Sequence, residues 1–184
     1  AMAGGSKQTT YRASVNYRDA DGILNGTGFQ RLNARLNLTQ KAINDRLTLT
    51  FLTAGTFNRS NYGYNDAWRY ATIYNPTAPI RDESNPDFDK WGGFYQNVLF
   101  DYYNPVAILE QNVNEGSDSR VNIAIKGAYE IIDGLTVDAF YSIQATEELR
   151  NQYYGKESFW QGADRNGNAR KESRQRWNQL FEST

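Results

Sequence analysis

The chain has 184 residues with 20 basic and 21 acidic side chains, so its formal net charge is −1 and it lacks the basic field with which proteins attract nucleic acid. It contains neither Cys nor His, which excludes disulfides, Ser–His and Cys–His nucleophile pairs, and imidazole metal ligands. Its mean hydropathy of −0.75 argues against a membrane-spanning helix, which needs about 20 consecutive apolar residues. A transmembrane β-strand is not excluded, because only every second residue of such a strand faces lipid.

The first patterned segment is TTYRASVNYRDADG, residues 9–22. Tyr11, Ala13, Val15 and Tyr17 alternate with polar residues. This period of two predicts a strand with one apolar and one polar face, and RDADG at its end predicts a turn. The apolar face either packs on a soluble core or contacts lipid.

The same alternation recurs in four further segments, 29–39, 46–57, 120–132 and 135–146. A last segment, 170–184, is polar on both faces until Trp177. The connections are alternately short and long, which favours a mostly β, antiparallel up-and-down meander whose two ends face different compartments. Transmembrane barrels have this order of periplasmic turns and extracellular loops. The alternative is a soluble β-sandwich or lectin-like module that presents aromatic loops.

The long connection, residues 58–119, contains all four prolines, and only 66–73 has a helical pattern. Connections of this length are usually functional or fold on themselves. The aromatic rings of this connection have two interpretations. In one, they stack on sugars or contact the side chains of a peptide ligand; in the other, they pack the loop on itself or against a partner protein. The rings are Trp68, Tyr70, Tyr74, Trp91, Phe94, Tyr95, Tyr102 and Tyr103.

Two acidic segments are weak metal candidates. Asp82, Glu83, Asp87 and Asp89 fit a solvated acidic loop better than a Ca²⁺ site. The segment 164–175 begins like an EF-hand loop but has Ala and Gln where that loop needs Gly and Glu. Glu147 and Glu148 are neighbours on a predicted strand, so they point to opposite faces and make a poor glycosidase pair. We therefore expect no metal, no cofactor and no enzymatic activity.

Two short motifs are more specific than any single strand: NPTAPI at 75–80 and NPVAIL at 104–109. Together with TTYRASVNYRDADG, RLNARLNLTQKAINDRLTLT and GLTVDAFYSIQ, in this order, they make the chain resemble the SusC/RagA family. These proteins are TonB-dependent outer-membrane transporters of Bacteroidetes. The resemblance extends over essentially the whole chain.

The resemblance implies that residues 1–184 form part of a 22-stranded transmembrane barrel, with about six of its strands. Residues 58–119 would then be a large, partly helical extracellular loop. The plug, the TonB box and the remaining strands lie outside this sequence. The implied activity is import of oligosaccharides or oligopeptides across the outer membrane. The implied partners are a SusD-like surface lipoprotein, the TonB complex acting through the plug, and outer-membrane lipid, with no nucleic acid.

In such a barrel the two faces of each strand have different roles. The expected lumen-lining residues are Arg12, Asn16, Arg31, Asn33, Arg35, Asn37 and Lys126. The expected lipid-facing residues are Tyr11, Val15, Leu36, Leu38, Leu49, Ile123, Ile125, Val137 and Ile143. Ligand or cap-lipoprotein contacts are expected from Trp68, Tyr70, Tyr74, Trp91, Tyr95, Tyr102 and Tyr103.

Overall fold

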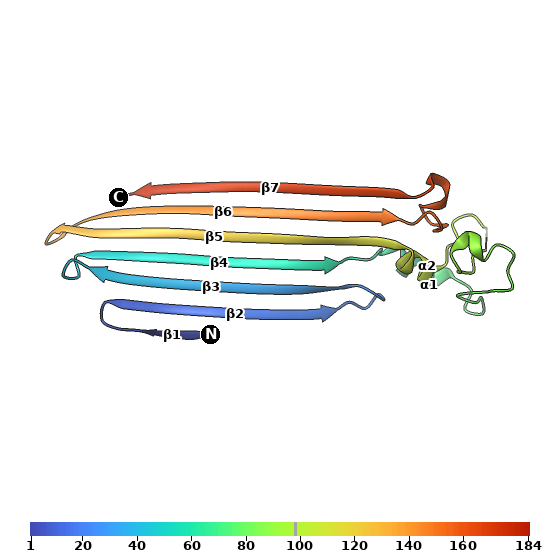
Figure 1. The fold of residues 1–184 in the computed structure, drawn as a ribbon, viewed down its shortest axis with the longest axis horizontal. Helices are drawn as coiled ribbons and strands as arrows, with labels where there is room; N and C mark the ends of the chain where they lie inside the picture. The colour runs from blue at the N-terminus through green and yellow to red at the C-terminus, as the bar shows by residue number, and fades with distance from the viewer. Residues whose placement is uncertain (98) are drawn as a thin grey trace.

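The computed structural model describes residues 1–97 and 99–184, and it contains one antiparallel sheet of seven strands in the order β1 to β7 (Figure 1). The strands are β1 (Met2–Gly5), β2 (Thr9–Asp21), β3 (Gly28–Ala42), β4 (Leu47–Asn61), β5 (Asn112–Ile132), β6 (Leu135–Tyr154) and β7 (Asn168–Ser183). The helices are α1 (Asp66–Ile73) and α2 (Pro105–Glu110), with 3₁₀ turns η1 (Asp89–Trp91) and η2 (Ala163–Arg165). The predicted antiparallel meander is confirmed.

The strands are longer than the sequence pattern indicates. β5 begins at Asn112 and β6 continues to Tyr154, so the long connection is 62–111 rather than 58–119. These extensions are mostly polar and have no regular apolar alternation, and their strand conformation comes from pairing with each other across the sheet. The structure also adds the short strand β1, which pairs with β2.

The connections are sorted by length between the two ends of the sheet (Figure 1). At one end, the short-turn end, lie residues 6–8, 43–46 and 133–134. At the other, the long-loop end, lie 22–27, 62–111 and 155–167. Gly134 has a φ of 84°, a left-handed conformation that suits glycine and closes the tight β5–β6 turn beside a bulge near Ile132.

The sheet is a single layer. Within the described residues, Asn112, Asn114 and Gly116 are the only fully buried strand residues, and β1 and β7 carry the outer edges. This arrangement differs from a sandwich, in which a second sheet covers one face. No helix in the described part of the chain is long and apolar enough to cross a membrane.

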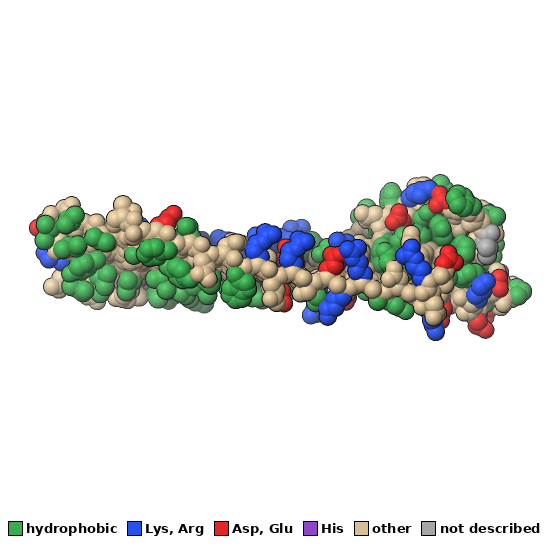
Figure 2. Space-filling view, turned by 90° about the horizontal axis from the view of Figure 1, so that it is seen from above, with side chains coloured by type: hydrophobic (Ala, Val, Ile, Leu, Met, Phe, Trp, Pro, Cys, Tyr) green, Lys and Arg blue, Asp and Glu red, His purple; other side chains and the backbone are tan. Residues whose placement is uncertain are grey.

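The hydrophobic core lies at the long-loop end, outside the sheet (Figure 1). It consists of Tyr64, Ala67, Tyr70, Ile108 and Trp160. Edge-on, the molecule is a thin layer that thickens where these loops gather (Figure 2). The fold therefore combines a bare sheet with one compact body, which we call the apical module and define as residues 62–111 and 155–167.

Candidate functional site

The strand register divides the sheet into an apolar and a polar face. Residues that pair directly across antiparallel strands lie on the same face. One such row reads Tyr11, Leu38, Phe51, Ile125, Tyr141 and Phe181 from β2 to β7. The next row on that face contains Ala13, Leu36, Thr53, Ile123, Ile143 and Gln179.

All nine residues predicted to face lipid lie on this apolar face, and none is buried. Val15 is 69% exposed and Ile125 is 50% exposed. A contiguous exposed apolar surface of this kind is rare in soluble monomers and marks contact with a membrane or a partner.

All seven residues predicted to line a lumen lie on the opposite, polar face. Arg12 pairs with Asn37, Asn16 with Asn33, and Arg31 lies between Arg18 and Asn58. On β5 to β7 the charges of this face are partly paired, as in Lys126–Asp138 and Arg174–Glu148, both at 3.6 Å. These pairs are exposed and contribute little to stability.

The apical module folds onto the polar face. At the start of β5, Asn112, Asn114 and Gly116 are buried while the alternate residues are exposed, and the buried three share the side of Lys126. The Asn114 side chain donates to the carbonyl of Gly63 at 2.6 Å. The Asn112 side chain donates to the carbonyl of Ile108 and to Ser158 Oγ at 2.8 and 3.0 Å. The two long loops are thereby held together over one face.

Aromatic rings fill the centre of the apical module. Tyr64 lies 4.9 Å from Trp160 and 5.2 Å from Tyr154, measured between ring centroids. The Tyr64 hydroxyl donates to the carbonyl of Val113 at 2.9 Å, and burial raises the pKa of this phenol. Trp160 and Phe159 belong to the loop 155–167, which lies outside the long connection that the sequence singled out.

The two Asn-Pro motifs meet at Asn104. Its Oδ1 accepts from the N–H groups of Val106 and Ala107 and caps α2, with Pro105 at the first helical position. Its Nδ2 donates to the carbonyls of Ile80 and Tyr95, each at 2.9 Å. Ile80 ends the NPTAPI motif, so Asn104 joins both motifs through a side chain that is 1% exposed.

Most of the predicted ligand-contact rings pack inside the module. Tyr70, Trp91 and Phe94 are buried, and Tyr74 stacks on Tyr102 at 5.0 Å. Burial raises the pKa of Tyr74 to about 12. Tyr95, Tyr102 and Tyr103 are half-buried. Trp68 is different, since 58% of it is exposed.

Large exposed residues of the module also include some that the sequence did not single out. Phe100 and Leu99 are 101% and 53% exposed, and Tyr62 is 45% exposed beside the guanidinium of Arg150. These residues lie in irregular segments, so no periodic pattern in the sequence indicates that they are exposed.

Asp101 ties the tip of the long loop to α1. It accepts from the Tyr70 hydroxyl at 2.7 Å and forms an ion pair with Arg69. The hydrogen bond from Tyr70 lowers the pKa of Asp101, while burial and then this bond raise the pKa of Tyr70 to about 12. The lowered carboxyl pKa means that the link is complete above the ordinary Asp pKa and is lost as pH falls through the lowered value.

We expect Asp101→Asn, which keeps a small acceptor but removes the charge, to loosen this loop tip. At pH 8, chymotrypsin should cleave after Phe100 several-fold faster in this variant than in the wild type, because local opening exposes the backbone. Asp87→Asn is the matched control, since its carboxylate forms no ion pair in the described part of the chain. Equal cleavage rates in the two variants would show that the Asp101 link does not hold the loop.

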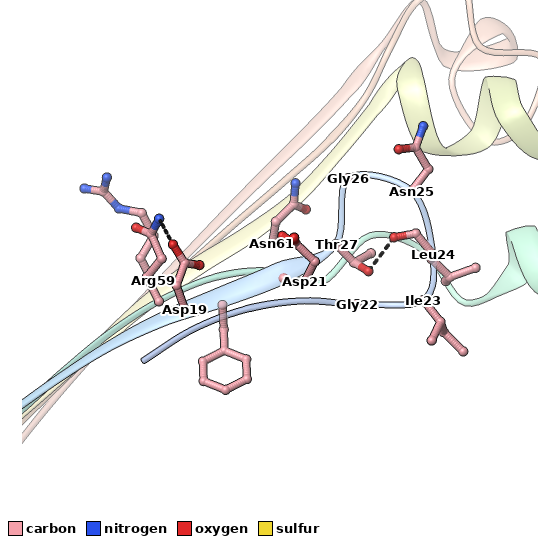
Figure 3. A pocket seen from close by; sticks show the side chains of 13 residues that line it. Asp19, Asp21, Gly22, Ile23, Leu24, Asn25, Gly26, Thr27, Arg59 and Asn61 are labelled. Carbon is pink, nitrogen blue, oxygen red and sulfur yellow. Dashed lines mark hydrogen bonds between the residues drawn. The ribbon is translucent and has the colours of Figure 1, made fainter. Parts of the chain in front are cut away.

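Two open hollows lie near the long-loop end. One, of about 680 Å³, borders the β2–β3 turn, where Thr27 Oγ1 donates to the carbonyl of Leu24 at 2.7 Å (Figure 3). Asp19 and Asp21 lie beside it. The other, of about 740 Å³, lies among β5, β6 and β7. Its polar-face side chains include Asp118, Arg120, Glu148, Arg150 and Arg174, beneath Tyr62.

Comparison with known proteins gives consistent matches. No protein-family profile matches the chain. It is 29% identical over 99 residues, 53% of its length, to the TonB-dependent receptor SusC of Bacteroides thetaiotaomicron. It is 29% identical over 121 residues to the TonB-dependent receptor P26 of Formosa agariphila, and 24% identical over 159 residues to the receptor P39 of the same organism. These matches cover 62% and 86% of the chain.

The fold agrees with the same group of proteins. Structures of the RagAB peptide importer in its closed-closed and open-open states superpose with TM-scores of 0.72 and 0.73, over 97% of the chain, at 18% identity. The chain spans 10% to 14% of the curated relatives' length and 20% of the RagAB chains. In sequence and in fold, the chain is therefore SusC/RagA-like and resembles one segment of the TonB-dependent receptors.

Proposed function

We propose that this chain forms part of the wall and the mouth of an outer-membrane importer for oligosaccharides or oligopeptides. The observation that carries the proposal is the division of one single-layer sheet into an exposed apolar face and a polar face with the apical module folded over it. The apolar face, including Tyr11, Val15, Leu36, Leu38, Leu49, Ile123, Ile125, Val137 and Ile143, would contact lipid. The polar face would line the lumen.

The shape of the apolar surface supports this proposal. On β2 the apolar positions run from Tyr11 to Tyr17, whereas on β5 they run from Val121 to Ile131. Because Tyr11 lies in the row of Ile125, the β5 stretch extends further toward the short-turn end. From β2 to β5 the apolar stretch is therefore offset along the strands, as expected where strands tilt by about 35–45° through a bilayer.

The apical module would stand on the extracellular side, since long loops lie there in outer-membrane barrels. Its exposed apolar side chains, Trp68, Ile80 and Phe100 among them, suit contact with a SusD-like lipoprotein or with the ligand. The buried rings would hold the loop in shape. Energy from the TonB complex would act through a plug in the complete receptor.

Uptake measurements test this proposal. Cells that express the complete gene should accumulate fluorescently labelled oligosaccharides or oligopeptides, and deletion of TonB should abolish the accumulation. A strain without the gene is the control for passive entry. Uptake that persists unchanged without TonB, or a gene product that extracts into buffer as a stable monomer without detergent, would contradict the proposal.

A further inference from the structure

The charges on the polar face are distributed unevenly between its two halves. On β2, β3 and β4, every residue of which is described, the polar face carries Arg12, Arg18, Arg31, Arg35 and Lys41 and no carboxylate. Both acidic residues of β2, Asp19 and Asp21, point to the other face. On β5 to β7 the same face holds acidic residues as well, among them Asp118, Asp138, Glu148 and Glu172.

Two guanidiniums of the carboxylate-free half are placed directly side by side. Arg18 and Arg31 are cross-strand partners on β2 and β3, and both lie over the ring of Phe29, at 5.2 and 5.3 Å. Like charges directly opposite each other in a sheet are destabilising. Within the described residues, neither arginine forms an ion pair. Both are exposed, so their charges are accessible.

The groups around this pair orient one of the two guanidiniums. Arg31 Nε donates to Asn58 Oδ1 at 2.7 Å, and Asn58 Nδ2 in turn donates to Asp118 at 2.7 Å. Asp118 thus reaches Arg31 only through the amide of Asn58. Within the described residues, Arg18 and the remaining N–H groups of Arg31 form no further hydrogen bond, so these donors can bind a ligand.

The position of the pair matches the mouth of the proposed importer. On β2, Arg18 follows Tyr17, the last residue of the apolar stretch, and precedes the turn 22–27 of the long-loop end. A ligand that enters from that end would meet this pair early. Arg35 and Arg12 continue the basic surface along the same face toward the short-turn end.

We propose that the surface formed by Arg18, Phe29 and Arg31 recognises anionic oligosaccharides that carry carboxylate or sulfate groups. This inference rests on the function proposed above. Guanidiniums bind such oxyanions with two parallel hydrogen bonds. The neighbouring side chains of Asn16 and Asn33 carry amides of the kind that bond sugar hydroxyls, and the ring of Phe29 holds the two guanidiniums side by side.

Calorimetric titration of the full-length gene product in detergent tests the inference. The probes are tetragalacturonate, a sulfated chondroitin tetrasaccharide, neutral cellotetraose and tetraglutamate. We expect at least one anionic sugar to bind more tightly than the neutral one. In the double variant Arg18→Gln/Arg31→Gln its affinity should fall about tenfold or more, since each arginine loses a charge-assisted hydrogen bond. Arg59→Gln, an exposed arginine on the opposite face of β4, should bind like the wild type.

The following results would overturn the inference. If the double variant bound anionic sugars as tightly as the wild type, or if Arg59→Gln lost as much affinity, Arg18 and Arg31 would not be the residues that recognise the ligand. Tighter binding of tetraglutamate with the same arginine dependence would assign the surface to acidic peptides. Binding restricted to the neutral sugar would remove the inference and leave the proposed function intact. Failure to bind or import any oligomer would remove both.

Discussion

Replacing Asn104 with alanine should destabilise the apical module by about 2–4 kcal/mol. The substitution removes the cap of α2, which leaves the N–H groups of Val106 and Ala107 without their acceptor. It also removes the donor to the carbonyls of Ile80 and Tyr95 in a site that excludes water. The loss should appear as faster hydrogen exchange, measured by mass spectrometry, across residues 74–111.

Two further variants separate the contributions at Asn104. Asn104→Ser keeps a capping oxygen and loses the two donors, so its effect should be roughly half as large. Asn75→Ala, in the other Asn-Pro motif, removes exposed bonds within a turn to Thr77 and should cost less than about 1 kcal/mol. If the exchange rates of Asn104→Ala and Asn75→Ala were the same, Asn104 would not be the residue that joins the two motifs.

Placing a charge on the apolar face should prevent stable insertion of the sheet. Ile125→Arg puts a guanidinium between Phe51 and Tyr141, near the middle of the apolar stretch of β5. At the centre of a bilayer this costs about 2–4 kcal/mol. The folded fraction of the full-length gene product in lipid vesicles, followed through urea unfolding, should therefore fall.

Asn122→Arg is the matched control for this change. It adds the same charge to the same strand, on the polar face and at an exposed position. Its effect should be within about 0.5 kcal/mol of zero, as for most surface substitutions. Equal destabilisation by both variants would mean that the two faces do not differ in their surroundings.

Strand periodicity in the sequence was sufficient to predict the faces, the meander and the alternation of turn lengths. In residues 11–17 and 121–125 every second side chain is apolar, so the period of two is visible within each strand without knowledge of its neighbours. The ends of β5 and β6 could not be predicted in this way. Residues 112–119 are held as strand by partners about 35 residues away along the chain, such as the pairing of Asn114 with Gln152.

The packing inside the apical module could not be predicted from the sequence pattern either. The aromatic content of residues 62–111 was evident, but nothing local indicated that Tyr64 packs against Trp160 or that Asn104 reaches Ile80. The surface formed by Arg18, Phe29 and Arg31 was not predicted, for a similar reason. Arg18, Arg31 and Phe29 become neighbours only through the β2–β3 register, and Phe29 falls on the polar face, where an aromatic residue breaks the alternation.

Whether each face of the sheet contacts lipid or water can be measured with single-cysteine labels, because this chain has no cysteine of its own. Single cysteines placed in turn at residues 121–126 of the full-length protein in lipid vesicles would carry an environment-sensitive fluorophore. We predict that nitroxide-labelled lipids quench the label at 121, 123 and 125, and that a water-soluble quencher acts at 122, 124 and 126. Quenching without this period of two, or lipid quenching at the even positions, would contradict the assignment of the apolar face to the membrane.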